Sequence, residues 1–173
     1  MLEIRVGEGI VARTPEIITS GGLGSCIVVT LYDTRMQIGG LAHIMLPYSK
    51  MWNNSRLEIR VSELQAPKPE LISPYQFADT SVTALLKEMQ REGARIEDIV
   101  AKMVGGAKMF YFNGENSPGI GEQNIAYMQK NLRKEGVPLI GKDIGGHHGR
   151  SIEFYLDSGR VIVKAVGIKD KEI

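Results

Sequence analysis

Two apolar runs separated by a short polar stretch restrict the fold of this chain more than any other feature. Ile27–Leu31 and Ile38–Leu46 are each long enough and apolar enough to form a buried strand. Asp33, Thr34 and Arg35 lie between them and are typical of a turn. The pattern of strand, turn and strand predicts an antiparallel hairpin, and the rest of the chain must fold so that this hairpin is covered.

The predicted hairpin brings together the only cysteine and one of the three histidines. Cys26 follows a glycine-rich stretch, Gly21–Ser25, which we expect to be a turn, and it stands at the start of the first apolar run. His43 lies near the middle of the second run. Folding at the turn places the two residues at similar heights on adjacent strands, where opposed Cβ atoms are about 4.5–5.5 Å apart. The thiol and the imidazole therefore meet if both point to the same face.

A cysteine beside a histidine has a specific chemical use. A free thiol has a pKa of about 8.5, which falls to about 3.5–7.5 beside a protonated histidine or a run of backbone N–H groups. The thiolate of Cys26 would be a nucleophile, and His43 could return the proton to a leaving group. Backbone N–H groups of the glycine-rich turn could hold an oxyanion.

The alternative is structural, since a lone cysteine is often a small buried apolar residue and a lone histidine a core residue. The position of Cys26 at the mouth of the glycine-rich turn, outside the apolar run, favours catalysis. Thr19 and Ser20 lie just upstream, and either hydroxyl could hydrogen-bond the imidazole or the thiol. Hydrogen bonding within a local turn is the commoner role of such hydroxyls.

Composition excludes several classes of protein. The formal net charge of +1 gives no electrostatic argument for binding nucleic acid or a membrane surface. Charges within the first five residues do not fit a signal peptide, and no apolar stretch reaches the roughly 20 residues of a membrane span. A single cysteine cannot form an intrachain disulfide and fits a reducing cytoplasm. We expect no metal site, because His147 and His148 lack a nearby ligand set, and these histidines are expected in a solvated turn or a partner surface.

The remaining pattern predicts one α+β or α/β domain over residues 1–173, with a mixed, mostly antiparallel sheet arrangement and two main helices. One helix is expected to carry Phe77 on its apolar face, to have Asp79 and Thr80 in its first turn and to stop at Gly93, and the other to run over Gly119–Glu135 and stop at Gly136. Residues 48–74 are expected to form a long irregular segment. Further strands are expected at Met1–Val6, Gly9–Arg13, Ile96–Val104, Val137–Lys142, Ser151–Tyr155 and Arg160–Val166.

Several motifs, spread over nearly the whole chain, resemble the CheD family of chemoreceptor glutamine deamidases. The nucleophile motif of that family resembles GGLGSCIVV, and its histidine motif resembles GGLAHIMLP. Similar segments follow in FADTSVTALLKEMQREGA, AKMVGGAKMF, IGEQNIAYMQKNLRKEGV and DIGGHHGRSIEFYLDSGRVIV. The resemblance implies a fold similar to the catalytic domains of deamidating toxins of the cytotoxic necrotizing factor type.

The resemblance also implies a mechanism without a cofactor. Cys26 corresponds to the family's nucleophile and His43 to its general base and acid. The family's third residue is a threonine six positions before the cysteine, where this chain has Ser20, with Thr19 as the neighbouring alternative. The implied reaction converts a receptor glutamine to glutamate with release of ammonia, and the same acyl chemistry hydrolyses glutamyl methyl esters.

Methyl-accepting chemotaxis receptors are the implied substrates, and the CheC phosphatase is the implied partner. Residues 48–74 form a longer segment than in the shorter family members, so the choice of receptor or partner could differ here. One alternative function is a mainly non-catalytic regulator of CheC. Another is a redox or metal sensor that uses Cys26, although the chain has no second cysteine to resolve an oxidised one.

Overall fold

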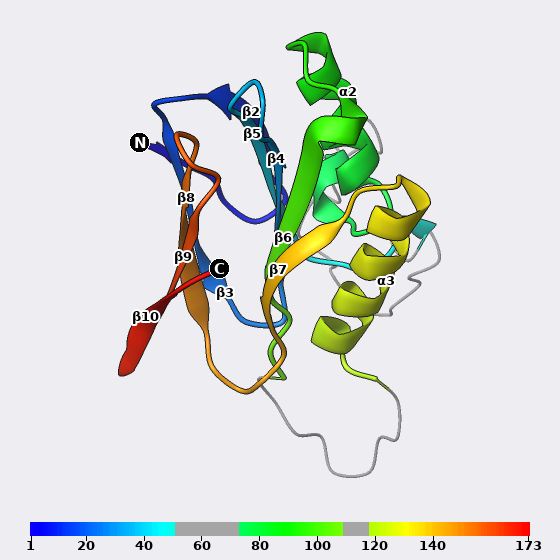
Figure 1. The fold of residues 1–173 in the computed structure, drawn as a ribbon. Coiled ribbons are helices and arrows are strands. Elements are labelled where there is room, and N and C mark those ends of the chain that lie inside the picture. Colours follow the sequence, from blue (N-terminus) through cyan, green and yellow to red (C-terminus); the bar gives the residue numbers. More distant parts are fainter. Residues whose placement is uncertain (51–72, 109–117) are drawn as a thin grey trace, which may run out of the picture.

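The computed structural model describes residues 1–50, 73–108 and 118–173. These residues form three layers, namely two five-stranded sheets packed face to face and a pair of helices on the outer face of the second sheet (Figure 1). Most of the irregular segment expected at 48–74 lies outside the described residues. The predicted α+β class, with mixed and mostly antiparallel sheets and two main helices, is confirmed. The likeness to toxin domains stays a prediction.

We call the sheet that lies between the other sheet and the helices the inner sheet, and it contains the predicted hairpin. Its strand order is β2-β5-β4-β6-β7, with bounds Gly9–Arg13, Ile38–Ile44, Ile27–Asp33, Ile99–Gly105 and Leu139–Ile144. Strands β4 and β5 pair antiparallel from Ile27 opposite Ile44 to Asp33 opposite Ile38, and every residue in both strands is buried. Their apolar runs lack alternation because both faces of this sheet are covered.

The outer sheet has the order β1-β3-β8-β9-β10, with bounds Leu2–Glu3, Ile17–Leu23, Arg150–Tyr155, Val161–Ala165 and Ile168–Glu172. Strand β10 was not expected from the sequence. All five of its residues are exposed, and four of them are charged, so no apolar alternation marks it. Its backbone pairs with β9 at the edge of the sheet, and Lys171 forms an ion pair with Asp143.

Two helices cover the inner sheet. Helix α2 spans Ser81–Arg91 and helix α3 spans Ile120–Lys134. The expected stops are confirmed, because Gly93 has φ +95° and Gly136 has φ +72°, both in the left-handed region that glycine tolerates. The expectation that Phe77 belongs to the first helix is wrong, although Asp79 and Thr80 do lie directly before its first residue, Ser81. Residues Pro74–Gln76 form a separate short 3-10 helix, and Phe77 instead makes a parallel bridge to Leu46.

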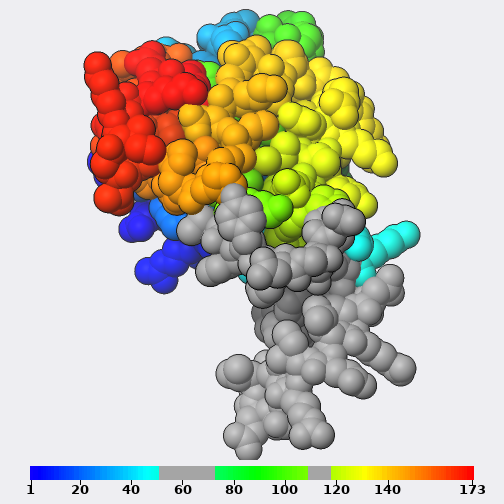
Figure 2. Space-filling view, turned by 90° about the horizontal axis from the view of Figure 1, so that it is seen from below, coloured from blue at the N-terminus to red at the C-terminus, as the bar shows by residue number. Residues whose placement is uncertain are grey.

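The apolar core is divided between the two interfaces of the three layers. Ala42 and Ile44 of β5 pack under the helices, whereas Leu41 faces the outer sheet. Because side chains alternate along a strand, His43 projects with Leu41 into the space between the sheets. Seen end-on, the C-terminal end of the chain with β10 (red) and helix α3 (yellow-green) lie on either side of the residues around the β7–β8 turn (orange) (Figure 2).

Two adjacent glycines in β5 offer a test of this layering. A Cβ at Gly39 would overlap Leu156 and lie 2.8 Å from the Phe154 ring, both in the core between the sheets. A Cβ at Gly40 would lie 3.2 Å from the flexible ends of Leu85 and Met89. We expect Gly39→Ala to lower the free energy of unfolding by about 1–3 kcal/mol through overpacking, and Gly40→Ala to cost less. Urea denaturation of both variants measures this, and an equal cost would contradict the packing described.

Candidate active site

The connection from the outer sheet to the inner sheet carries the cysteine. Strand β3 ends at Leu23 and β4 begins at Ile27, so only three residues, the last of them Cys26, cross between the sheets. The pairing of β3 with β8 slips between Ser20 and Leu23, as in a β-bulge, and Gly22 at this point has φ +72°. The glycine-rich stretch expected to be a turn is therefore partly strand, since Gly21 and Gly22 belong to β3.

The end of β6 fixes this connection in place. The Gly106 N–H donates to the Cys26 carbonyl oxygen at 2.8 Å, and the Ala107 N–H donates to that of Gly24 at 2.8 Å. Gly105 has φ +111°, and a Cβ there would overlap the carbonyl oxygen of Cys26. Glycine is required at this position because the two backbones approach so closely.

His43 and Ser20 meet between the two sheets. His43 of β5 is fully buried, and its Nδ1 lies 2.9 Å from Oγ of Ser20 of β3. The residue directly opposite His43 on β4 is Val28, and Cys26 precedes Val28 by two residues. Cys26 lies one residue before β4, and the alternation of that strand, continued back from Val28, predicts that Cys26 is a diagonal neighbour of His43 on the same face, two residues from the direct opposition expected.

The hydrogen bonds of Ser20 determine which nitrogen of His43 carries the proton. The Ser20 hydroxyl donates to the Ile4 carbonyl oxygen at 3.0 Å. A hydroxyl has a single hydrogen, so Oγ must accept from the N–H at Nδ1 of His43. The other ring nitrogen, Nε2, is then an unprotonated acceptor, and it is buried with no hydrogen-bond partner among the described residues. This is the tautomer that a general base needs.

Burial keeps both reacting groups uncharged. It lowers the pKa of His43 to about 4, because the charged imidazolium loses its hydration. Burial also raises the pKa of the Cys26 thiol, and the opposing effect of its own backbone N–H is smaller. The expectation of a lowered thiol pKa is therefore wrong, since a neutral imidazole supplies no positive charge to stabilise a thiolate. At neutral pH the pair consists of a thiol and a neutral base.

The structure distinguishes the two hydroxyls that precede Cys26. Ser20 is 2% exposed and contacts His43, whereas the Thr19 hydroxyl donates to the Leu2 carbonyl oxygen at 3.4 Å. Adjacent residues of a strand point to opposite faces, so only one of them can face the space between the sheets. Ser20 is the one that does.

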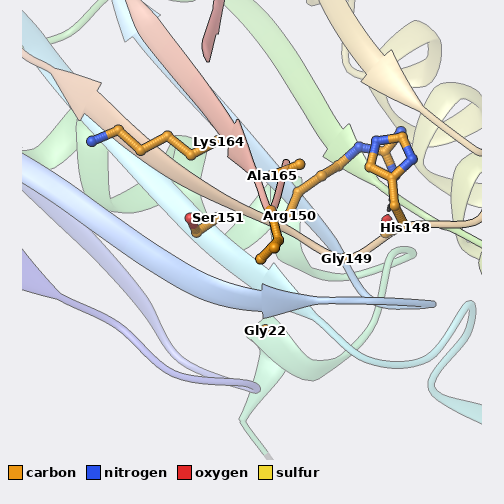
Figure 3. A pocket seen from close by; sticks show the side chains of 8 residues that line it. Gly22, His148, Gly149, Arg150, Ser151, Lys164 and Ala165 are labelled. Atoms are coloured by element: carbon orange, nitrogen blue, oxygen red, sulfur yellow. Dashed lines mark hydrogen bonds between the residues drawn. The ribbon is translucent and has the colours of Figure 1, made fainter. Parts of the chain in front are cut away.

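The adjacent histidines lie in the exposed turn between β7 and β8, as expected. Among the described residues no three histidine, cysteine or acidic side chains gather as metal ligands would. His148 lines a groove of about 510 Å³ beside Gly22, with Lys164 at its opposite end (Figure 3). Arg150 of this groove donates to Asp143 at 2.8 Å and to Gly145 O at 2.7 Å, so its guanidinium braces the turn. Neither Cys26 nor His43 lines the groove.

One residue near the site carried no signal in the sequence. Asn124 of α3 is fully buried, and its Nδ2 donates to the carbonyl oxygens of Ser25 at 3.0 Å and Met45 at 3.1 Å. It lies within an ordinary amphipathic helix pattern, and although the segment IGEQNIAYMQKNLRKEGV resembles the CheD family, nothing in it marks Asn124 as part of the site. Only the tertiary contact between α3 and the crossing segment reveals it.

Comparison with known proteins identifies the family. Residues 62–165, more than half of the chain, match the family described as CheD chemotactic sensory transduction. A protein of Caldanaerobacter subterraneus named probable chemoreceptor glutamine deamidase CheD is 37% identical over 169 residues, covering 96% of this chain and 94% of that protein. The chain belongs to the CheD family. Proteins of the same name from Clostridium acetobutylicum and Haloarcula marismortui are 37% and 35% identical, covering 99% and 95% of this chain and 95% and 84% of their own lengths.

The CheD relatives align over nearly the whole chain, including the segments that carry Ser20, Cys26 and His43, whereas the family match begins after them. Among the helices of the described residues, none has the length and apolar character needed to cross a bilayer.

The burial of neutral His43 predicts a pH dependence of stability. The folded protein binds this proton only near pH 4, whereas an unfolded histidine binds it near 6.5. Between these values the unfolded state binds more protons, so stability is complete above pH 6.5 and is lost as the pH falls toward 4, by up to about 3 kcal/mol.

The test compares wild type with His43→Asn, whose amide can still donate to Ser20, by urea denaturation at about pH 7 and about pH 4.5. Carboxylates titrate alike in both proteins, so the difference between the two pH dependences isolates His43. We expect wild type to lose about 2–3 kcal/mol more than the variant. Parallel pH dependences would show that His43 is not held neutral by the fold.

Proposed function

We propose that this chain is a deamidase that converts glutamine side chains of chemoreceptors to glutamate, with Cys26 as nucleophile and His43 as general base and acid. The observation that carries the proposal is the hydrogen bond from His43 Nδ1 to Ser20, which leaves Nε2 unprotonated and free to accept a proton. The names of the CheD relatives supply the substrate class.

The reaction begins from a neutral pair. As the substrate carboxamide approaches, Nε2 of His43 takes the thiol proton and the sulfur of Cys26 forms a bond to the carboxamide carbon. The carbonyl oxygen becomes an oxyanion, which backbone N–H groups of the crossing segment would hold, that of Cys26 among them. Nucleophile and base are activated together only when a substrate is present, because burial disfavours the charged state of both.

The same low basicity drives the second half of the reaction. A buried imidazolium whose pKa is about 4 is a strong acid, so His43 readily protonates the amide nitrogen, which leaves as ammonia. Water, deprotonated by Nε2, then attacks the thioester carbon, and collapse of the intermediate restores the thiol and releases glutamate. A glutamyl methyl ester would follow the same steps with methanol as the leaving group.

Several partners and conditions belong to the proposal. Water is the sole co-reactant, so no cofactor is required. A single cysteine that must remain a thiol fits the reducing cytoplasm. From the family resemblance we also propose a CheC-type phosphatase as a binding partner. Co-purification of the untagged phosphatase with a tagged form of this protein would test the proposal.

The nucleophile is tested by Cys26→Ala. Alanine removes the sulfur that forms the covalent bond and leaves the partly buried position filled, so we expect ammonia release to fall to background with the fold intact. Ammonia is measured with a purified receptor fragment, the modified glutamines are identified by mass spectrometry, and circular dichroism checks the fold. Activity at the wild-type rate would remove Cys26 from the mechanism and favour a regulatory role for the protein.

The positioning role of Ser20 has a control in its neighbour Thr19. Ser20→Ala removes the acceptor that orients His43, and misorientation reduces kcat by up to about a hundredfold while KM changes little. Ser20→Thr keeps a hydroxyl and is expected to retain activity. Thr19→Ala removes a hydroxyl that contacts Leu2 instead, so its kcat should stay near that of wild type. The reverse pattern, with Thr19 as the sensitive position, would refute the assignment.

A further inference from the structure

We propose that Asn124 is a positioning residue, which holds Cys26 at the correct distance from His43. This inference rests on the proposed deamidase function. Its basis is the pair of hydrogen bonds from Nδ2 of Asn124 to the carbonyl oxygens of Ser25 and Met45. Ser25 immediately precedes the nucleophile, and Met45 follows the histidine by two residues, so one side-chain nitrogen links the two segments that carry the reacting groups.

The link lies where the sheet itself stops holding these segments together. The pairing of β4 with β5 ends at Ile27 opposite Ile44, and the next pair would have been Cys26 opposite Met45. Met45 instead turns away, and its N–H donates to the Gln76 carbonyl oxygen at 3.0 Å. The two strands therefore separate at the nucleophile. The Asn124 amide bridges them at that place, with one hydrogen for each carbonyl.

Helix α3 gives the amide a rigid base. Its first turn packs against the glycine turn that follows β6, since a Cβ at Gly121 would lie 2.6 Å from the Gly106 carbonyl oxygen. The N–H of Gly106 in turn holds the Cys26 carbonyl oxygen. The helix that supplies Asn124 is thus seated on the same turn that fixes Cys26, so a displacement of one is transmitted to the other.

The chemistry of the side chain argues against a mere packing role. Asn124 is fully buried, and its Oδ1 has no hydrogen-bond partner within residues 1–50, 73–108 and 118–173, which costs free energy that an apolar residue would not incur. The orientation of the amide is fixed, because a flip would place Oδ1 against two carbonyl oxygens. What the amide contributes at this position is its two N–H donors.

The experiment compares Asn124→Ala with Asn131→Ala. Asn131 lies two turns later on α3, is also buried, and donates to a single carbonyl oxygen, that of Ala78, away from the reacting pair. With a receptor fragment as substrate, we expect Asn124→Ala to lower kcat by about a hundredfold and to change KM by less than about twofold. Asn131→Ala should leave kcat within about twofold of wild type, because its loss does not move Cys26.

Two further variants keep the test decisive if Asn124→Ala folds poorly. Asn124→Asp has the same shape and lacks both donors, so it should lose kcat as the alanine variant does. Gly121→Ala keeps the amide but displaces the first turn of α3, because the added Cβ would overlap the backbone of Gly106. A folded Asn124→Asp or Gly121→Ala protein with wild-type kcat would overturn the proposal.

The outcomes separate this inference from the proposed function. If Cys26→Ala remains active, the deamidase mechanism itself is wrong. If Cys26→Ala is inactive but Asn124→Ala and Asn131→Ala lose kcat equally, the mechanism stands and the positioning role of Asn124 is refuted. A loss of kcat that is specific to Asn124→Ala supports positioning. Complete alkylation of Cys26 by iodoacetamide after denaturation of that variant shows that its thiol is chemically intact.

Discussion

The hydrogen bond between Ser20 and His43 joins two sheets that otherwise contact each other through apolar side chains near the site. Each partner comes from a different sheet, so the bond exists only if β3 and β5 pack face to face in the correct register. The same packing buries the imidazole and lowers its pKa, and the acceptor geometry selects the tautomer. Orientation, protonation state and basicity of His43 thus depend on one contact between layers.

The short crossing from β3 to β4 turns this packing into a site. Because the chain passes from one sheet to the other in a few residues, the cysteine on the crossing must lie at the end of the space that His43 faces. The glycines on either side serve different purposes. Gly22 permits the bulge that ends the pairing of β3, and Gly105 permits the close backbone approach that fixes Cys26.

Local patterns in the sequence predicted the local structure. The hairpin followed from two apolar runs around a polar turn, and both helix stops followed from single glycines. The division of ten strands between two sheets did not follow, because it depends on pairings between residues far apart in the chain. Strand β10 was missed since its exposed, charged residues carry no apolar alternation, and its pairing with β9 and its ion pair with Asp143 are contacts with other parts of the chain.

The same distinction between local sequence patterns and contacts of distant residues applies to the site. Cys26 and His43 can be singled out from their spacing around one turn, and their action as a pair stays a prediction. The choice of Ser20 over Thr19, the direction of the thiol pKa and the contact of Asn124 depend on burial and on the packing of distant elements. Sequence reasoning treated the imidazole as charged, and only the closed space between the sheets shows that it is neutral.

The raised pKa of Cys26 affects how easily its thiol is oxidised when no substrate is bound. Peroxides and electrophiles attack the thiolate, and a cysteine that stays protonated at neutral pH is a poor target for them. A preformed ion pair would be reactive at all times and exposed to irreversible oxidation. In the mechanism that we propose, the thiolate forms only during an encounter with a carboxamide, so the burial that raises the pKa of Cys26 would also protect the resting protein from oxidation.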